Sequence, residues 1–388
     1  MDSIAKMRDD NFHAKTYARF PLVIKSGKGS LVYDENGKEY IDLSSGIAVN
    51  TFGVADDEWV KAVTKQLGQL QHMSNLFYTE PVAALAEKLC KKVNMQRAFF
   101  CNSGAEANEC AIKAARKYSQ EKYKKERYKI ITLVNSFHGR TMATLTATGQ
   151  DVFHKDFTPM LDGFYYAEAG NLEQVENFIK NGDTAAIMFE IVQGEGGVMP
   201  LNKDFVTALD NIAKQNDILL ICDEVQCGNG RCGTYFAYEQ YGISPDIVTT
   251  AKGLGGGLPI GATLFGEKTQ DVLVPSSHGS TFGGNPVCAA AALNVVDRID
   301  ENLLNEVIKK GNYIKETLCG KDGIKSVSGL GLMLGLETEK PAAEIVQKCR
   351  ENGVIVITAK TKVRLLPPLN IPWELLQKAV DVIIDACK

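Results

Sequence analysis

The sequence lacks the apolar run of about 18 residues that a membrane-spanning helix requires, which argues against a membrane protein of that kind. It also lacks a basic excess, because 43 lysines and arginines stand against 47 aspartates and glutamates. Nucleic-acid binding therefore has no electrostatic support. Residues 1–10 mix charges of both signs and have no apolar core, so they do not resemble a secretory signal. We expect a cytoplasmic protein without membrane or nucleic-acid partners.

A metal-binding cysteine pattern is also missing. Cys222, Cys227 and Cys232 are evenly spaced, but neither a Cys-x-x-Cys pair nor a histidine lies near them. Most of the ten cysteines lie inside apolar runs, which favours buried free thiols in a reducing compartment. We therefore expect no metal site.

The length and the hydrophobic pattern predict an α/β protein with more than one lobe. A chain of 388 residues exceeds one ordinary domain of roughly 100–200 residues. Short β-branched runs alternate with amphipathic helical patterns, which is typical of a mainly parallel sheet covered by helices on both faces. A hairpin is expected at 29–43, turning at Asn36-Gly37. Buried strands are expected at 98–101, 129–134, 185–191, 218–223, 246–250 and 262–265, and helices at 57–71, 106–118, 286–300 and 372–387.

Polar residues that follow the predicted strands are the first candidates for a site, since ligands gather at the carboxyl ends of parallel strands. Ser103 follows one strand, has capping-box spacing to Glu106 and opens a helix. The free N–H groups there suit a phosphate, although a simply capped helix is the alternative. Asp223 and Glu224 directly follow another apolar run. A buried Asp223 is suited to holding a protonated heterocyclic nitrogen, and a solvated or capping aspartate is the alternative.

Lys252 lies between a predicted strand and the glycine-rich segment 253–257. Glycines let the backbone approach a bulky ligand closely. A partly desolvated lysine loses its proton more readily and becomes a nucleophile toward an aldehyde, whereas a solvated lysine is the alternative. A phosphate-binding loop is excluded because it needs Gly-Lys-Ser/Thr in that order, and the glycine spacing does not match a dinucleotide fingerprint.

The segment 137–141 follows a further predicted strand and combines an aromatic residue with a cation. Phe137 is suited to stacking on a flat ring while Arg140 grips a carboxylate, and a core phenylalanine with a surface arginine is the alternative. Glu195 and Arg364 stand alone in the sequence, where surface positions or salt bridges would explain them equally well. His138 and His278 have no visible acid–base partner and are expected to be structural.

Together and in this order, these segments resemble the class III (ornithine-type) aminotransferases over nearly the whole chain. The matching segments are GKGSLVYDENGKEYIDL, HMSNLFYTEP, FFCNSGAEANECAIKAARKY, FHGRT, FEIVQGEGGV, LLICDEVQCGNGRCG, PDIVTTAKGLGGGLPIGA and HGSTFGGNP. The resemblance implies a fold-type I enzyme with a large domain around a mainly parallel seven-stranded sheet. It also implies a smaller α/β domain built from both termini. The expected division is 1–50 packing with the small domain, 51–300 as the large cofactor domain and 301–388 as the small domain.

The resemblance implies pyridoxal 5'-phosphate as the cofactor. Lys252 would carry it as a Schiff base and later move the substrate proton, while Asp223 would pair with the pyridine nitrogen. The further cofactor contacts that the resemblance implies are Ser103, Gly104 and Ala105 on the phosphate, Phe137 on the ring, Gln226 on the phenolic oxygen and Thr281 on the phosphate of the neighbouring subunit. The last contact requires a homodimer with shared active sites.

The reaction that the resemblance implies is transfer of the terminal amino group of N-acetylornithine to 2-oxoglutarate, a step of arginine biosynthesis. Arg140 would hold the substrate α-carboxylate. Arg364 would bind the acceptor's second carboxylate, and Glu195 would neutralise Arg364 when the donor is bound, because an unpaired buried charge is costly. Gly46 stands where ornithine aminotransferases tend to carry tyrosine, which leaves room for an acyl group. The other residues expected to bind substrate are Tyr17, Asn75 and Ser280.

Other activities remain open at this point. Within the same chemistry, the alternatives are succinyl-ornithine, succinyl-diaminopimelate, ornithine and 4-aminobutyrate transaminases. A glutamate-1-semialdehyde-type aminomutase would share the fold without an external acceptor. A non-catalytic relative is a third class, against which the joint presence of Lys252, Asp223, Phe137 and Arg140 argues.

Overall fold

A computed structural model, which describes residues 3–123 and 126–388, contains a seven-stranded sheet with the order β4-β12-β11-β10-β7-β5-β6. β12 runs antiparallel to β4 and β11, and the other neighbouring strands pair in parallel, so the expected mainly parallel α/β sheet is confirmed. The strands are β4 (Arg97–Cys101), β5 (Lys129–Leu133), β6 (Phe164–Ala167), β7 (Thr184–Phe189), β10 (Leu219–Asp223), β11 (Ile247–Thr250) and β12 (Gly261–Phe265). All but the edge strand β6 lie where the sequence predicts a strand.

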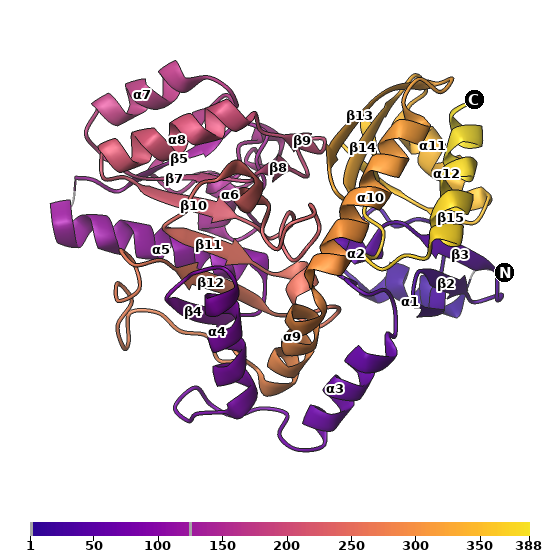
Figure 1. Cartoon of the computed structure of the whole chain (residues 1–388), viewed down its shortest axis with the longest axis horizontal. Helices are drawn as coiled ribbons and strands as arrows, with labels where there is room; N and C mark the ends of the chain where they lie inside the picture. Colours follow the sequence, from indigo (N-terminus) through magenta and orange to yellow (C-terminus); the bar gives the residue numbers. More distant parts are fainter. Residues whose placement is uncertain (1–2, 124–125) are drawn as a thin grey trace.

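Helices cover both faces of this sheet because successive side chains of a strand point to opposite faces. In β10, Leu219 and Ile221 pack in the apolar cluster that includes α5 (Gly104–Tyr123), whereas Leu220 and Cys222 pack in the cluster that includes α8 (Lys203–Gln215). Figure 1 shows α5 on one side of the sheet and α7 (Leu172–Lys180) with α8 on the other. The sheet is thus buried on both faces, as its uninterrupted apolar strands predict.

A smaller α/β body contains strands from both ends of the chain. One sheet has the order β1-β2-β3-β15, in which the parallel pairing of Val354 with Ile41 joins a C-terminal strand to an N-terminal hairpin. A second sheet has the order β13-β14-β17-β16. The strands are β1 (Ile24–Lys28), β2 (Leu31–Asp34), β3 (Glu39–Asp42), β13 (Ile324–Leu330), β14 (Met333–Thr338), β15 (Val354–Ile355), β16 (Ile357–Ala359) and β17 (Lys362–Leu365).

The hydrophobic core of the smaller body combines Ile41 and Leu43 with residues between Val307 and Cys387. The expected small domain from the two termini is therefore confirmed. We propose the limits 1–50, 51–300 and 301–388 for the division, of which residues 1–2 lie outside the described part of the chain. Figure 1 shows the two bodies side by side, linked by α9 (Pro286–Arg298) and α10 (Glu301–Leu318).

The remaining elements agree with the sequence pattern except at some ends. The predicted helix 57–71 ends at Leu67, where the N–H of Gly68 bonds to the last turn, and the predicted helix 106–118 is longer in both directions. The other helices are α1 (Ile4–Phe12), α2 (Ser45–Ala48), α3 (Asp57–Leu67), α4 (Glu80–Lys92), α6 (Met142–Ala147), α11 (Ala342–Glu351) and α12 (Trp373–Cys387). Short elements are η1 (Asp151–Phe153), η2 (Ala237–Tyr241), η3 (Lys252–Leu254), β8 (Val192–Gln193) and β9 (Met199–Pro200).

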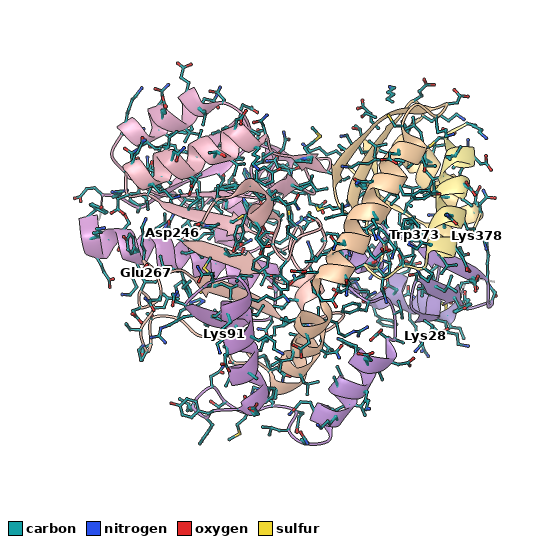
Figure 2. All side chains as sticks on the ribbon, viewed as in Figure 1. Lys28, Lys91, Asp246, Glu267, Trp373 and Lys378 are labelled. Atoms are coloured by element: carbon teal, nitrogen blue, oxygen red, sulfur yellow. The ribbon has the colours of Figure 1, made fainter. Side chains whose placement is uncertain are left out.

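The two ends of the strands in the large sheet, which form two opposite edges of it, have different surroundings. Because β12 is antiparallel to β11, Asp246 before β11 and Glu267 after β12 lie at the same edge, on the left of Figure 2. Trp373 and Lys378 of α12 mark the smaller body on the right. The carboxyl ends of the parallel strands form the opposite edge, where the candidate site lies.

All ten cysteines are free and all but Cys319 are buried, which confirms the expectation for the thiols. Within residues 3–123 and 126–388, no three His, Cys, Asp or Glu side chains gather as a metal site would require. No helix in the described part of the chain has the length and apolar character needed to cross a bilayer.

Candidate active site

A cavity of about 460 Å³ lies at the carboxyl edge of the large sheet. Its walls come from the segments that follow β4, β5, β7, β10 and β11, so strands distant in sequence contribute to one site. The sequence-predicted residues that line it are Ser103, Gly104, Ala105, Phe137, Arg140, Asp223, Gln226 and Lys252. The structure therefore brings most of the predicted cofactor residues together.

One corner of the cavity is the N-terminus of α5. The Ser103 hydroxyl accepts a hydrogen bond from the Glu106 N–H at 3.2 Å, and the Glu106 carboxylate accepts one from the Asn102 N–H at 2.6 Å. The helix is thus capped, as the plainer interpretation held, and also lines the cavity. Gly104 and Ala105 lie in the first turn, where N–H groups have no partner within the helix, so they remain available for an anion.

Asp223, at the end of β10, is buried and held by three donors. Its Oδ2 accepts hydrogen bonds from Asn108 Nδ2 at 2.7 Å and from His138 Nδ1 at 2.8 Å, and its Oδ1 accepts one from the Val225 N–H at 3.0 Å. His138, for which the sequence shows no acid–base partner, therefore gains a carboxylate partner through the fold. Because Oδ1 has a single donor, it retains acceptor capacity for a ligand N–H.

Lys252 lies half-buried in the cavity wall, at the start of η3. Burial lowers the pKa of its ammonium group to about 8, with Glu195 acting in the opposite direction and Arg364 adding to the decrease. At pH 7 about a tenth of this lysine is therefore the free amine, which is the nucleophilic form, and the fraction rises as pH approaches 8.

Glu190 is a buried carboxylic acid of the cavity that the sequence analysis missed. It is only 2% exposed, and its Oε2 accepts a hydrogen bond from the Phe137 N–H at 3.0 Å. Burial raises the pKa of Glu190 well above its usual range, and the nearby Asp223 adds to the increase. Glu190 directly follows the apolar run of β7, which is the same signal that identified Asp223.

Arg140 is an exposed cation at the cavity rim. Its guanidinium carbon lies 4.4 Å from the centre of the Phe153 ring and 5.6 Å from that of Phe137. Within residues 3–123 and 126–388, it has no carboxylate partner. The structure therefore leaves this guanidinium available for a ligand carboxylate.

Glu195 and Arg364, which stand alone in the sequence, form an ion pair beside the cavity. Arg364 NH1 lies 2.7 Å from Glu195 Oε1 and also donates to Gln226 Oε1 at 3.3 Å. The Arg364 side chain is 3% exposed, and its Nε is buried with no partner among the residues that the structure describes. A buried guanidinium with an unused donor is suited to binding a second carboxylate. Glu195 supplies the compensating negative charge as long as no such carboxylate is bound.

The structure places the remaining predicted residues outside the cavity of a single chain. Tyr17 is 70% exposed on the N-terminal segment. The Asn75 side chain donates to the carbonyl groups of Ser280 at 3.1 Å and Gly283 at 2.8 Å. Ser280 and Thr281 line a second hollow of about 350 Å³, which adjoins the first because Asn102 lines both.

Gly46 lies in a left-handed turn, Ser45–Ala48, in which its φ is +64°. A Cβ at this position would meet no atom closer than 3.7 Å. Packing therefore does not require the small residue, although the backbone conformation favours glycine.

The arrangement of the cavity walls fits pyridoxal phosphate. A Cβ on Gly104 would lie 2.6 Å from Val225, and one on Gly139 would lie 2.8 Å from Ala105, so close packing of the walls depends on glycine. A lysine of lowered pKa faces the same space as a buried aspartate and a helix N-terminus. The fold and the site together define a pyridoxal-phosphate-dependent enzyme of the aminotransferase kind.

Comparison with known families agrees with this assignment. The model for "Aminotransferase class-III" matches residues 12–387, and the chain belongs to this family. Pyridoxal phosphate is the cofactor of the family.

Individual relatives cover nearly the whole chain. The acetylornithine aminotransferase of Haemophilus ducreyi is 50% identical over 97% of both chains. A crystal structure of N-acetylornithine aminotransferase from Stenotrophomonas maltophilia has a TM-score of 0.84 at 34% identity, covering 99% of this chain and 98% of its own. The ornithine aminotransferase of Toxoplasma gondii, described with pyridoxal phosphate at its active site, has a TM-score of 0.94 at 29% identity and covers 100% of this chain and 95% of its own.

Proposed function

We propose that the protein transfers the terminal amino group of N-acetylornithine to 2-oxoglutarate, within arginine biosynthesis. The observation that carries this proposal is the 50% identity, over 97% of both chains, to an enzyme named acetylornithine aminotransferase. Ornithine is the second candidate donor, because the ornithine aminotransferase of Toxoplasma gondii has the TM-score of 0.94 given above.

The chain's own groups supply cofactor binding and proton transfer in this proposal. Bound pyridoxal phosphate supplies the electron sink through which the amino group is exchanged. The Lys252 amine would carry the cofactor and, once free of it, would hold the transferred proton, while Asp223 Oδ1 would accept a hydrogen bond from the ring nitrogen. Ser103, Gly104 and Ala105 bind the phosphate, Phe137 packs on the ring, and Gln226 contacts the phenolic oxygen.

Two arginines divide the work of binding substrate carboxylates. Arg140 has no carboxylate partner in the described part of the chain and holds the α-carboxylate. Arg364 pairs with Glu195 while the uncharged acetamide tail of the donor is bound, and it is free for the second carboxylate of 2-oxoglutarate when Glu195 turns away. Gly46, Tyr17, Asn75 and Ser280 border the acyl group.

The site is completed in a homodimer in the cytoplasm. Leu76, Phe77 and Tyr78 are 88%, 59% and 105% exposed, which supports an apolar contact with a second copy. They line the same groove as Thr281, which would then contact the phosphate of the neighbouring subunit. Ten free thiols support a reducing compartment.

A comparison of amino donors tests the proposal. Glutamate formation from 2-oxoglutarate is measured with N-acetylornithine, N-succinylornithine, ornithine and 4-aminobutyrate at equal concentrations. We expect the acylated amines to react fastest. Faster reaction of ornithine or 4-aminobutyrate would overturn the donor but not the class of reaction, whereas turnover without 2-oxoglutarate would indicate an aminomutase.

A further inference from the structure

Asn108 is a buried amide on the second turn of α5 that uses every hydrogen-bonding group of its side chain. Its Nδ2 donates to Asp223 Oδ2 and to the His138 carbonyl oxygen, both at 2.7 Å. Its Oδ1 accepts a hydrogen bond from the Thr249 hydroxyl at 2.6 Å. Asn108 is 1% exposed, and its amide can take only this orientation because the NH₂ group faces two acceptors and the oxygen faces a donor.

These partners belong to the segments that carry the proposed site. Asn108 lies one helical turn after Gly104, at the phosphate-binding end of α5. The His138 carbonyl belongs to the loop that carries Phe137 and Arg140, and Thr249 belongs to β11, which leads into Lys252. One side chain therefore fixes the relative positions of several parts of the cavity wall.

Packing alone does not explain an amide here. The same helix otherwise packs against the sheet through apolar side chains, most of them small, namely Cys110, Ala111, Ile112, Ala114 and Ala115. An alanine at position 108 would continue this pattern. It would, however, leave Asp223 Oδ2 with His138 as its one side-chain donor and the Thr249 hydroxyl without its acceptor.

We propose that Asn108 is a positioning residue for the cofactor. It holds the Asp223 carboxylate at a fixed rotation, so that Oδ1 faces the ring nitrogen, and it fixes the loop of Phe137 against the phosphate-binding end of α5. This inference rests on the proposed function only in that Asp223 and Phe137 contact the cofactor. It does not depend on the identity of the amino donor.

The test is pyridoxal phosphate binding to cofactor-free protein, followed by visible absorption and repeated across pH. We expect Asn108→Ala to weaken binding by about tenfold to a hundredfold, since hydrogen bonds to a charged group are lost. Asn108→Asp keeps the shape but brings a second carboxylate against Asp223 and the His138 carbonyl. It should weaken binding at least as much and move the pH dependence of the absorption band.

Ser119→Ala is the matched control, because Ser119 is a buried polar residue of the same helix whose hydroxyl has no partner within residues 3–123 and 126–388. It should leave cofactor binding and the absorption band unchanged. Thr249→Val and Thr249→Ser give a second pair if Asn108→Ala does not fold. Only the valine variant loses the hydroxyl that orients the amide, so it should bind the cofactor more weakly while the serine variant matches the wild type.

Wild-type affinity and an unchanged band in Asn108→Ala would overturn the inference, as would an equal loss in Ser119→Ala. If the variants fail to fold at position 108, equal affinity of Thr249→Val and Thr249→Ser would do so. Because the measurement contains no amino donor, a wrong donor leaves this test valid. Failure of the wild type to bind pyridoxal phosphate at all would instead reject the proposed function itself.

Discussion

Two buried carboxyl groups at neighbouring strand ends differ from each other because they have different hydrogen-bond donors. Asp223 has three donors, two of them side chains, whereas the carboxyl group of Glu190 has the single N–H of Phe137. Burial raises the pKa of Glu190 well above its usual range. Two acids thus lie near Lys252 in one cavity, one provided with donors for a charged carboxylate and the other suited to keeping its proton.

The free amine of Lys252 gives a prediction for pH dependence. The pKa of about 8 lies below the usual value of 10.5, so the nucleophilic amine accumulates as pH rises through 8. We expect the rate of pyridoxal phosphate addition to the cofactor-free protein to rise with a midpoint near pH 8 and then level off. Stopped-flow absorption measures it, with Nα-acetyl-lysine as the control, whose midpoint should lie near 10.4. A protein midpoint equal to that of the control would contradict the burial argument.

The sequence identifies those site residues that can be recognised from their immediate neighbours in the chain. Lys252 and Asp223 could be singled out as candidates because each lies at the end of a predicted strand, and the resemblance to the family then gave them their roles. The contact of His138 with Asp223 could not, since the two residues are brought together only by the order of β5, β7 and β10. Asn108 lies within a regular helical pattern, where nothing in the sequence separates it from an exposed helical residue. The placement of Glu195 against Arg364 agrees with the residues chosen from the resemblance, while their alternating roles stay a prediction.

At the scale of elements, the sequence predicts most strands of the large sheet but not their direction. A buried apolar run looks the same in a parallel and an antiparallel strand, so the reversed direction of β12 had no signal. The edge strand β6 was missed because Phe164, Tyr165 and Tyr166 are only partly buried and follow no uninterrupted apolar pattern. Helix ends also differ from the prediction. The cap at Gly68 ends α3 before the apolar pattern of the segment ends.

The connection between β10 and η2 gives a prediction for stability. Glu224 is buried, and its carboxyl oxygens accept the N–H groups of Ala237 and Tyr238, both at 2.9 Å. Burial raises the pKa of Glu224 to about 8 from its usual 4.5. The folded protein therefore keeps this proton over a range in which the unfolded chain has lost it, so stability falls as pH rises through that range.

Glu224→Gln removes this titration. We expect the free energy of unfolding of the wild type, relative to Glu224→Gln, to fall by about 1.4 kcal/mol per pH unit between about 5 and 8 and then stay constant. Denaturant unfolding of the cofactor-free proteins measures it, and Glu267→Gln at the exposed edge seen in Figure 2 is the control for loss of a glutamate. A difference that does not vary with pH would show that Glu224 is ionised in the folded protein.

At the scale of the whole molecule, the residues that we propose for the site lie in more than one region of the chain. The cavity holds the proposed catalytic groups, whereas Asn75, Ser280 and Thr281 line a neighbouring groove beside the exposed Phe77. Tyr17 also lies at the surface. A site shared between two subunits would require such a distribution. At the level of the sequence, only the resemblance to class III aminotransferases led us to expect it.

Disrupting the exposed apolar segment tests the homodimer. We expect Phe77→Asp to convert the dimer to a monomer, because a charge would be buried in the contact, and to weaken pyridoxal phosphate binding at least tenfold through loss of the Thr281 contact. Light scattering and an absorption titration measure the two effects. Leu161→Asp, at a residue 41% exposed outside the groove, is the control. A Phe77→Asp protein that remains a dimer would place the contact elsewhere.

The parallel pairing of β3 with β15 has a consequence for synthesis of the chain. Ile41 donates its N–H to the carbonyl of Gly353, so the hairpin made first by the ribosome gains its last partner only when nearly all of the chain has emerged. The strands of the large sheet lie between these two segments and are complete much earlier. The larger body can therefore assemble during translation, whereas β3 keeps an unpaired edge until β15 has been synthesised.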